Sequence, residues 1–274
     1  METREIVIEA GRSESQYWKD LWRFRELLFF LTWRDILVRY KQTVIGVAWA
    51  LIRPLLTMVV FTVLFGRLAK LPSEGVPYPV LVFAALLPWQ LFAGSLTECS
   101  HSLIKNASMI SKTYFPRMLA PLSAMVTGFA DFLLSLVMLG ILLAVYRVVP
   151  DWRILTVPLF AAISVGAALG LGLWFAALNV KYRDFMQIVP FVVQIGLYVS
   201  PVGFTSSIVP EEWRTLYYLN PVVGAIDGFR WALLGTSHSL YVPGIISSVA
   251  IVILLCASGV WYFRRTERTF ADII

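Results

Sequence analysis

Three ionisable residues stand inside long apolar stretches and are the first candidates for chemistry: Arg53, beside Pro54, Glu98 and Asp131. A charge within a bundle of membrane helices is a functional-site hypothesis by default. For Asp131 the alternative is hydrogen bonding to Ser and Thr hydroxyls of neighbouring helices, whereas we expect Arg53 and Glu98 to reach the nearby membrane surface. A single acid without a chain of Asp, Glu or His partners is poor support for a proton relay, which argues against a proton-coupled carrier.

The chain lacks the residue patterns that nucleotide binding, metal binding and disulfide formation require. The chain has no G-x-x-x-x-G-K-[ST] sequence and no Gly-Lys pair, so it has no Walker loop for nucleotide phosphates. His101 and His238 fall in different connecting segments without Cys or carboxylate partners at ligand spacing, and we expect no metal site. Cys99 and Cys256 are too few for a disulfide scaffold. We therefore predict no catalytic residues, no enzyme activity and no cofactor in this chain.

The composition indicates which solvent surrounds these residues. Of 274 residues, 58% are hydrophobic and 15% charged, against roughly 45–50% and about 25% in soluble domains. The aromatic share of 14% includes 10 Trp, a residue that favours bilayer interfaces. The net charge of +6 would suggest nucleic acid on a soluble protein, but here its distribution matters more. We expect a membrane protein without a nucleic-acid partner, and a water-soluble enzyme is improbable.

Long apolar stretches recur along the chain, each of about 18 residues or more, enough to cross a hydrocarbon core of about 30 Å as a helix. They lie at about 45–66, 78–98, 118–146, 154–179, 186–204 and 243–263. We predict an all-α integral membrane protein with six transmembrane helices over 45–263.

Lys and Arg residues set the expected orientation. Sixteen fall in 1–44, 99–117, 180–185 and the tail 264–274, whereas six fall in the alternate connecting segments. Loops on the cytosolic side carry the excess of positive charge. We therefore expect both termini in the cytosol and the segment 205–242 on the outer side.

The segment 1–44 mixes aromatic and aliphatic residues with basic ones before the first span. Such a sequence is typical of an amphipathic helix that lies along the membrane surface. Its candidate anchor residues are Trp22, Trp33, Arg34, Arg39 and Tyr40. The alternative is a bare positive-inside signal without a structure of its own.

The segment 205–242 is too apolar for a loop and too charged for a lipid-exposed helix. Short helices that dip back into the outer leaflet satisfy both conditions, because irregular backbone is tolerated there against protein or a water-filled cavity. A helical cap on the outer surface is equally compatible with the composition.

The segment 99–117 is basic and amphipathic, and Pro116 ends any helix. A loop that only reverses direction needs few residues. We expect apolar side chains exposed beside the membrane at Leu103, Ile104, Met109, Ile110, Tyr114 and Phe115. Such a segment is suited to docking a partner protein; an interfacial helix without a partner is the alternative.

Five sequence elements, in this order, carry a family resemblance. They are RDILVRYKQTVIGVAWALIRPL (34–55), YFPR (114–117), NVKYRD (179–184), SPV (200–202) and LNP (219–221). Over nearly its whole length the chain resembles the membrane subunits of type-2 ABC exporters, specifically those that export lipid-linked polysaccharide such as O antigen, capsule or teichoic acid.

The resemblance implies a homodimer in the bacterial inner membrane that pairs with two copies of a cytosolic ATP-binding-cassette ATPase, the subunit that would bind ATP and Mg. It also implies a coupling helix at about 100–117 and outer gate helices at about 205–242. The coupling residues would be Lys105, Asn106, Met109, Lys112, Tyr114, Phe115 and Arg117. The substrate would be a lipid-linked polysaccharide, and membrane lipids would surround the bundle.

Aromatic faces suit a moving polysaccharide because they stack on sugar rings and release them. Each such residue could equally belong to an interface belt. The candidates for the translocation path are Trp49, Phe61, Phe65, Trp89, Phe92, Tyr198, Phe204, Tyr217, Tyr218, Phe229 and Trp231.

Two other functions stay open. A type-2 exporter of small hydrophobic molecules often has a large outer domain, whereas the first outer loop here, 67–77, is short. A secondary carrier should show pseudo-symmetric halves and more buried ionisable groups, and neither is visible.

Overall fold

The computed structural model describes residues 14–41, 46–182, 184–235 and 240–270. Expectations that fall on 1–13, on 42–45 of the first-span entry, on Arg183, on His238 and on 271–274 lie outside these ranges. Every regular element in the described ranges is a helix, so the all-α prediction holds there.

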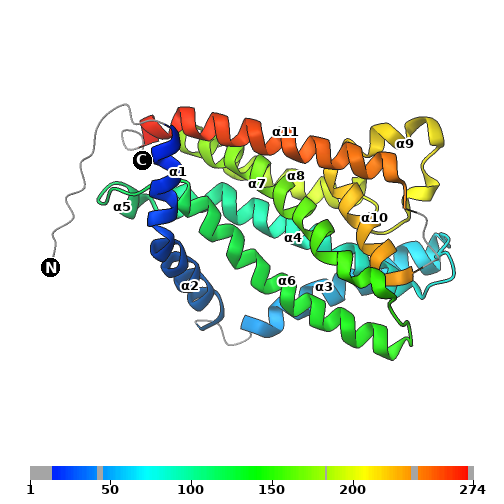
Figure 1. Cartoon of the computed structure of the whole chain (residues 1–274). Coiled ribbons are helices and arrows are strands. Elements are labelled where there is room, and N and C mark those ends of the chain that lie inside the picture. The colour runs from blue at the N-terminus through cyan, green and yellow to red at the C-terminus, as the bar shows by residue number, and fades with distance from the viewer. Residues whose placement is uncertain (1–13, 42–45, 183, 236–239, 271–274) are drawn as a thin grey trace.

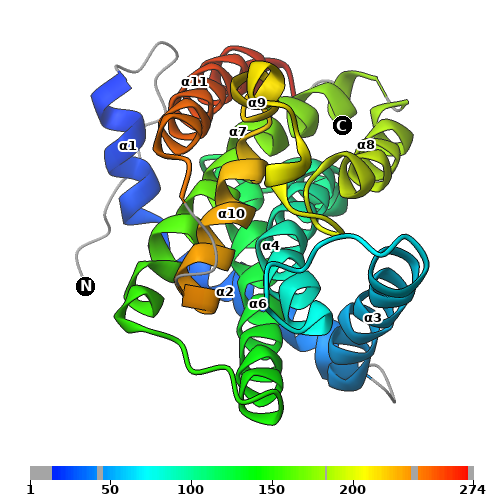
Figure 2. The same ribbon diagram turned by 90° about the vertical axis from the view of Figure 1, so that its right-hand side faces the viewer.

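Five helical stretches are long and apolar enough to span a membrane. They run side by side and make up the body of the molecule (Figure 1). They are α3 (Gly46–Phe61) with η1 (Thr62–Leu68), α4 (Tyr78–Lys105), α6 (Leu119–Val145), η2 (Trp152–Thr156) with α7 (Val157–Lys181), and α11 (Val242–Thr266) with η5 (Glu267–Thr269). Helix α4 lies near the middle when the bundle is viewed along its length, and α3 and α6 lie toward its margin (Figure 2).

The prediction of a sixth span at 186–204 is not matched by a helix of sufficient length. Helix α8 (Phe185–Val199) has 15 residues, about 22 Å, whereas the hydrocarbon core is about 30 Å thick. It ends at Ser200, whose backbone is extended at φ −79° and ψ 153°. Pro201 explains this ending, because the residue before a proline is disfavoured in the helical region.

A close approach of α7 to α11 depends on glycine. A Cβ added at Gly170 would lie 2.6 Å from the carbonyl carbon of Leu255, and one added at Gly259 would lie 2.4 Å from the carbonyl oxygen of Gly170. Both distances are shorter than atoms tolerate. The G-x-x-x-G pattern of Gly166 and Gly170 thus serves packing within the subunit.

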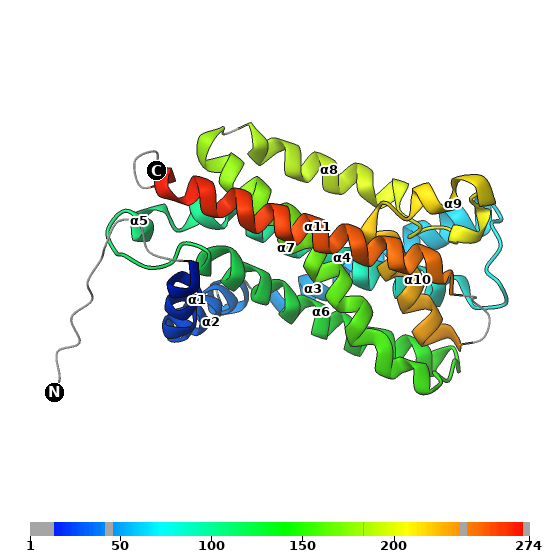
Figure 3. The same ribbon diagram turned by 45° about the horizontal axis from the view of Figure 1, so that its top comes forward.

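The two ends of the bundle differ in what they carry. One end, here the α5 end, gathers α1 (Glu14–Arg23), α2 (Arg25–Lys41), α5 (Ala107–Ile110) and the end of α11 (Figures 1 and 3). Helices α1 and α2 run across the bundle there (Figure 1). The opposite end, here the α9 end, carries α9 (Glu211–Tyr217) and the start of α4.

The segment 205–242 combines a buried helix with an exposed one. Helix α10 (Pro221–Leu234) is buried over most of its length and packs on α4, α7 and α11, whereas α9 has no buried residue. The LNP sequence explains where α10 begins. The Asn220 side chain accepts a hydrogen bond from the Val222 N–H at 3.2 Å, and Pro221 suits the first helical position.

Candidate functional site

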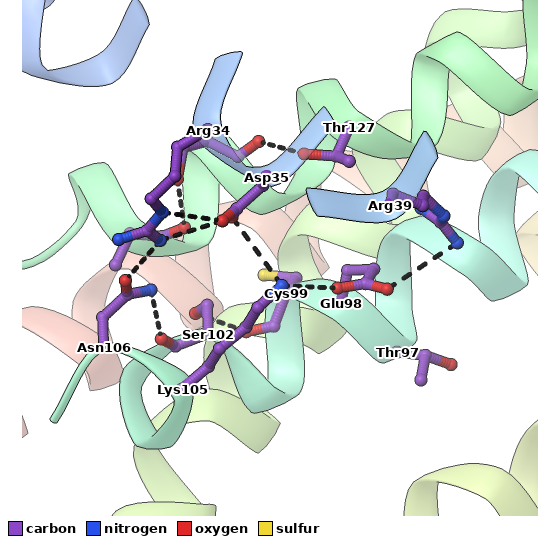
Figure 4. A network of polar contacts seen from close by, with 12 residues as sticks. Arg34, Asp35, Arg39, Thr97, Glu98, Cys99, Ser102, Lys105, Asn106 and Thr127 are labelled. Atoms are coloured by element: carbon purple, nitrogen blue, oxygen red, sulfur yellow. Dashed lines mark hydrogen bonds and ion pairs between the residues drawn. The ribbon is translucent and has the colours of Figure 1, made fainter. Parts of the chain in front are cut away.

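A polar network joins α2 to the C-terminal end of α4 (Figure 4). The Arg34 guanidinium donates to Asp35 Oδ1 at 2.8 Å and to Asn106 Oδ1 at 2.7 Å. Asn106 in turn donates through Nδ2 to the carbonyl oxygen of Ser102 at 2.8 Å. Two predicted sets of residues, the interfacial anchors and the coupling residues, therefore meet in one contact between Arg34 and Asn106.

The network continues along α4 to α6. Lys105 Nζ lies 3.8 Å from Asp35 Oδ2 and 3.8 Å from Glu98 Oε2. The Arg39 guanidinium lies 3.7 Å from Glu98 Oε1 and 3.1 Å from Asp131 Oδ2. Glu98 and Asp131, which the sequence left without charged partners, are thus both ion-paired to α2.

Tyr40 completes this set by donating a hydrogen bond to Asp131. Burial, followed by the hydrogen bond to the Asp131 carboxylate, raises the pKa of Tyr40, so the phenol keeps its proton. We call Arg34, Asp35, Arg39, Tyr40, Glu98, Lys105, Asn106 and Asp131 the ionic network. Its three cations balance its three carboxylates, and most of its charged side chains are partly exposed. Such pairs exchange partners at low cost.

A cavity of about 850 Å³ lies beside the network between α2, α3, α4 and α6. We call it the inner groove. Arg39, Tyr40 and Asp131 line it from the network side, and Trp49 and Arg53 line it from α3. The rest of its lining is Ala50, Pro54, Leu87, Gln90, Leu91, Ala93, Gly94, Gly128, Phe132 and Ser135.

The segment 99–117, called the docking segment here after its predicted role, is only partly exposed. Lys112 and Tyr114 are exposed, and the Tyr114 side chain retains 51% of its accessible surface. The expectation of exposed apolar side chains is wrong for Leu103, Ile110 and Phe115, which are buried in a core cluster together with residues of α7 and α11. The physical reason is that the end of α11 lies beside this segment and covers its apolar face.

The YFPR sequence is fixed to that end of the chain. The Arg117 backbone N–H donates to Glu267 Oε1 at 2.9 Å, and its guanidinium donates to the Glu267 carbonyl oxygen. Tyr17 donates to the same carboxylate at 3.2 Å, and the Arg264 guanidinium lies 3.9 Å from the centroid of the Tyr17 ring. Burial raises the pKa of Tyr17. Helix α1, the docking segment and η5 thus meet at one carboxylate.

Arg230 organises the α9 end. Its side chain is 1% exposed, and it donates to the carbonyl oxygens of Phe204 at 2.7 Å, Val202 at 3.0 Å and Leu81 at 3.3 Å. Burial lowers its pKa, opposed by the nearby Asp227. The SPV sequence and the chain after it are therefore held to α4 and α10 through their backbone.

The predicted path aromatics divide by burial. Trp49 on α3 and Tyr198 on α8 are exposed on the subunit. The partly buried members are Phe65, Phe204, Tyr217 and Trp231. Within the subunit's own core lie Phe61, Trp89, Phe92, Tyr218 and Phe229.

The predicted anchor residues also divide. Trp22 and Trp33 are exposed on the subunit surface, whereas Arg34, Arg39 and Tyr40 turn to the network. Sequence reasoning missed Asp35 and Glu267, whose partners lie 70 and 150 residues away. An acid in the middle of a basic, apolar helix is the signal that points to Asp35, and Glu267 has no comparable signal.

Residues 26–234 match the family described as ABC-2 type transporter. The chain is 30% identical over 257 residues to an O-antigen export system permease protein RfbA of Klebsiella pneumoniae, covering 91% of this chain and 95% of that protein. It is 29% identical over 263 residues to the protein of the same name of Myxococcus xanthus, covering 93% and 98%. It is 17% identical over 206 residues to the polysialic acid transport protein KpsM of Escherichia coli, covering 73% of this chain and 78% of that protein.

Proposed function

Since the chain belongs to the ABC-2 type transporter family, we propose that it is the membrane permease of an ATP-driven exporter of lipid-linked polysaccharide. The observation that carries the proposal is the similarity to O-antigen export permeases over at least 91% of the chain. The names of these relatives do not favour an exporter of small hydrophobic molecules. A helical membrane bundle with a polar, partly exposed end fits a transport subunit whose ATPase is a separate protein.

The proposed assembly is a homodimer with two ATPase subunits. The α5 end would face the cytosol, because the excess of Lys and Arg falls in the segments that gather there. Helix α8 and the turn after it would form the sixth crossing. Contact with a protein partner or local thinning of the bilayer would compensate for the short length of α8. Both termini would then be cytosolic.

The ATPase would dock on the exposed part of 111–114. Phe115 and Ile110 tie this segment to the core, and Asn106 ties its start to α2. A displacement of Lys112 and Tyr114 by the ATPase would therefore be transmitted to α1, α2 and α11 together. This is the physical sense in which the segment would couple ATP hydrolysis to the bundle.

The polysaccharide path would run along the exposed aromatic faces of α3 and α8, with Trp49 and Tyr198 as its first candidates. Tyr198 lies against Phe61, with ring centroids 6.1 Å apart, so this face continues into the core. At the outer end α9 and α10 would narrow the exit. Arg230 of α10 donates to the backbone carbonyl oxygens of Val202 and Phe204, which supports a gate in which α10 and this part of the chain move as one unit.

The decisive experiment replaces the exposed docking residues in cells depleted of the native subunit. Lys112→Ala with Tyr114→Ala should reduce surface polysaccharide several-fold and weaken copurification of the ATPase. Phe115 is left intact, because it is 4% exposed and its truncation would disturb packing.

The matched control is Lys70→Ala with Tyr146→Ala, the same residue types exposed at the α9 end, which should leave export unchanged. Equal export and equal ATPase recovery in both double variants would contradict the docking proposal. Unchanged surface polysaccharide in cells that lack the subunit altogether would contradict the export proposal itself.

The orientation has its own test in a background with Cys99→Ala and Cys256→Ala. Glu211 and Arg268 are exposed at opposite ends of the bundle. A membrane-impermeant thiol reagent should label Glu211→Cys in intact cells and should label Arg268→Cys only after the membrane is opened. The reverse pattern would overturn the proposed orientation.

A further inference from the structure

The inner groove opens between two helices whose flanks are suited to lipid. On α3 the residues Leu56, Val59 and Val60 are exposed, and on α6 the residues Phe129, Leu133 and Val137 are exposed. An exposed face of this composition on a membrane-spanning helix meets acyl chains or another membrane protein. The groove is therefore an indentation in an apolar surface, with polar lining residues contributed by α2, α3, α4 and α6.

Arg53 is the unbalanced charge of the groove. The other two ionised groups of the lining, Arg39 and Asp131, are paired with each other at 3.1 Å. The Arg53 guanidinium lies 5.5 Å from the centroid of the Trp49 ring. Among the residues that the structure describes, no carboxylate lies within ion-pair distance of Arg53.

The depth of Arg53 makes that imbalance informative. It is five residues inside the span that starts at Ala48, about 8 Å along the helix, near the boundary between headgroups and acyl chains. At this boundary a guanidinium lies at the level of the lipid phosphates, which it can bind through paired N–H donors. Gln90, which also lines the groove, makes no side-chain hydrogen bond within the described part of the chain.

We propose that the inner groove binds a glycerophospholipid with an anionic headgroup, whose phosphate accepts hydrogen bonds from Arg53 and Gln90 and whose acyl chains lie along α3 and α6. A guanidinium offers a phosphate two parallel N–H donors. The largely apolar walls, with Leu87, Leu91 and Phe132 among them, favour a lipid over free phosphate. No lining residue comes from α8, so the groove shares Trp49 but not Tyr198 with the proposed polysaccharide path, and this favours a bilayer lipid over the exported molecule.

Binding there would connect two parts of the subunit that share few other contacts. Arg39 and Tyr40 belong to both the ionic network and the groove lining, whereas Arg53 belongs to α3. A bound headgroup would hold the end of α2 to the start of the first span. The lipid site is inferred from residues of α2, α3, α4 and α6 alone and does not rest on the proposed export function.

The test uses the full chain, purified and placed in phosphatidylcholine nanodiscs that contain a small fraction of a photoactivatable lipid. One arm carries photoactivatable phosphatidylglycerol and the other photoactivatable phosphatidylcholine, and cross-linked peptides are identified by mass spectrometry. We expect the anionic probe to label the α3 and α6 peptides of the groove about tenfold more than the zwitterionic one, which is the scale of one charge-assisted contact. Equal labelling by the two probes would overturn the proposal.

Variants assign the effect to Arg53. Arg53→Gln should reduce labelling by the anionic probe to the phosphatidylcholine level, and Arg53→Lys should retain part of it, which shows that the groove is still formed. Arg67→Gln, at the other end of the same span, is the matched control and should change nothing. Unreduced labelling in Arg53→Gln would refute the assignment.

Competition separates the sources of phosphate. Unlabelled phosphatidylglycerol should displace the probe, whereas inorganic phosphate should not. If a polyprenyl diphosphate displaces the probe at lower concentration than phosphatidylglycerol does, the groove is a site for the exported lipid and the proposal is wrong.

Discussion

The two ends of the bundle use arginine in opposite ways. At the α5 end, Arg34 and Arg39 bind side chains on other helices and stay about one third exposed. At the α9 end, Arg230 is fully enclosed and binds three backbone carbonyl oxygens. A partly exposed ion pair contributes about 0–1 kcal/mol, whereas each buried acceptor left without its donor costs about 1–3 kcal/mol.

This difference indicates which end is able to rearrange. The ionic network has three cations and three carboxylates within reach of one another, so one pair replaces another without leaving a buried charge. Arg230 cannot exchange one partner for another in this way, because its partners are backbone carbonyl oxygens on fixed elements. We infer that motion during transport is easier at the α5 end, and that the α9 end moves as a rigid unit.

Arg230→Met should have the largest effect on stability. It removes the guanidinium and leaves the buried carbonyl oxygens of Val202 and Phe204 without their donor, at a cost of about 2 kcal/mol or more. The Leu81 carbonyl oxygen lies inside α4 and keeps its helical hydrogen bond. The measurement is thermal unfolding in detergent, followed by tryptophan fluorescence. Arg67→Met, exposed at the same end, should change the stability by less than about 0.5 kcal/mol. Equal midpoints for the two variants would remove the contrast between the ends.

Tyr218→Phe should have the next largest effect. The hydroxyl donates to Asp227 Oδ2 at 2.5 Å, and the ring is buried, so the change leaves a carboxylate oxygen without its donor. We expect a loss of about 1–2 kcal/mol. Tyr217→Phe, whose hydroxyl bonds to the carbonyl oxygen of Val199 at a more exposed position, is the control and should lose less. The reverse order would show that burial does not set the strength of these contacts.

Hydropathy and helix length were sufficient to predict most of the fold. The predicted spans at 78–98 and 118–146 correspond to α4 (Tyr78–Lys105) and α6 (Leu119–Val145), because a run of apolar residues in lipid has to form a helix to satisfy its backbone. The predicted sixth span is matched only by the short helix α8 (Phe185–Val199), for a local reason. Pro201 ends α8 inside the apolar run, and hydropathy does not register a helix ending.

The ionic network could not be predicted because its contacts join residues far apart in the sequence. Nothing in the sequence indicates that Asp35 lies near Lys105, or Arg39 near Asp131. What the sequence did indicate was that Glu98 and Asp131 need an explanation as charges in apolar surroundings. The role of Arg230 could not be predicted either, since backbone acceptors leave no pattern in side-chain types.

A double-mutant cycle on Arg39 and Asp131 would measure the strength of the α5 end directly. Arg39→Gln and Asp131→Asn remove one charge each, and the double variant removes both. We expect a coupling energy of about 0.5–1 kcal/mol, because both side chains are about one third exposed. Asp131→Asn alone should reduce surface polysaccharide only modestly, since in the proposed function ATP hydrolysis supplies the driving force. A coupling energy above about 3 kcal/mol, or complete loss of export in Asp131→Asn, would indicate a fixed or proton-transferring charge instead.

The smallest effect is expected for Lys105→Gln. Lys105 lies 3.8 Å from both Asp35 and Glu98, and its side chain is 47% exposed, so water already screens the attraction. Removing the charge should change the unfolding free energy by less than about 0.5 kcal/mol, and the residual difference should vanish in about 0.5 M salt, where the screening length falls to a few ångströms. Asp35 provides the internal comparison, because it is 5% exposed and keeps Arg34 as a second partner. If Lys105→Gln destabilised the protein as much as Arg230→Met and did so at every salt concentration, the α5 end would be as fixed as the α9 end, and the ionic network would have to be regarded as a rigid joint between α2 and α4.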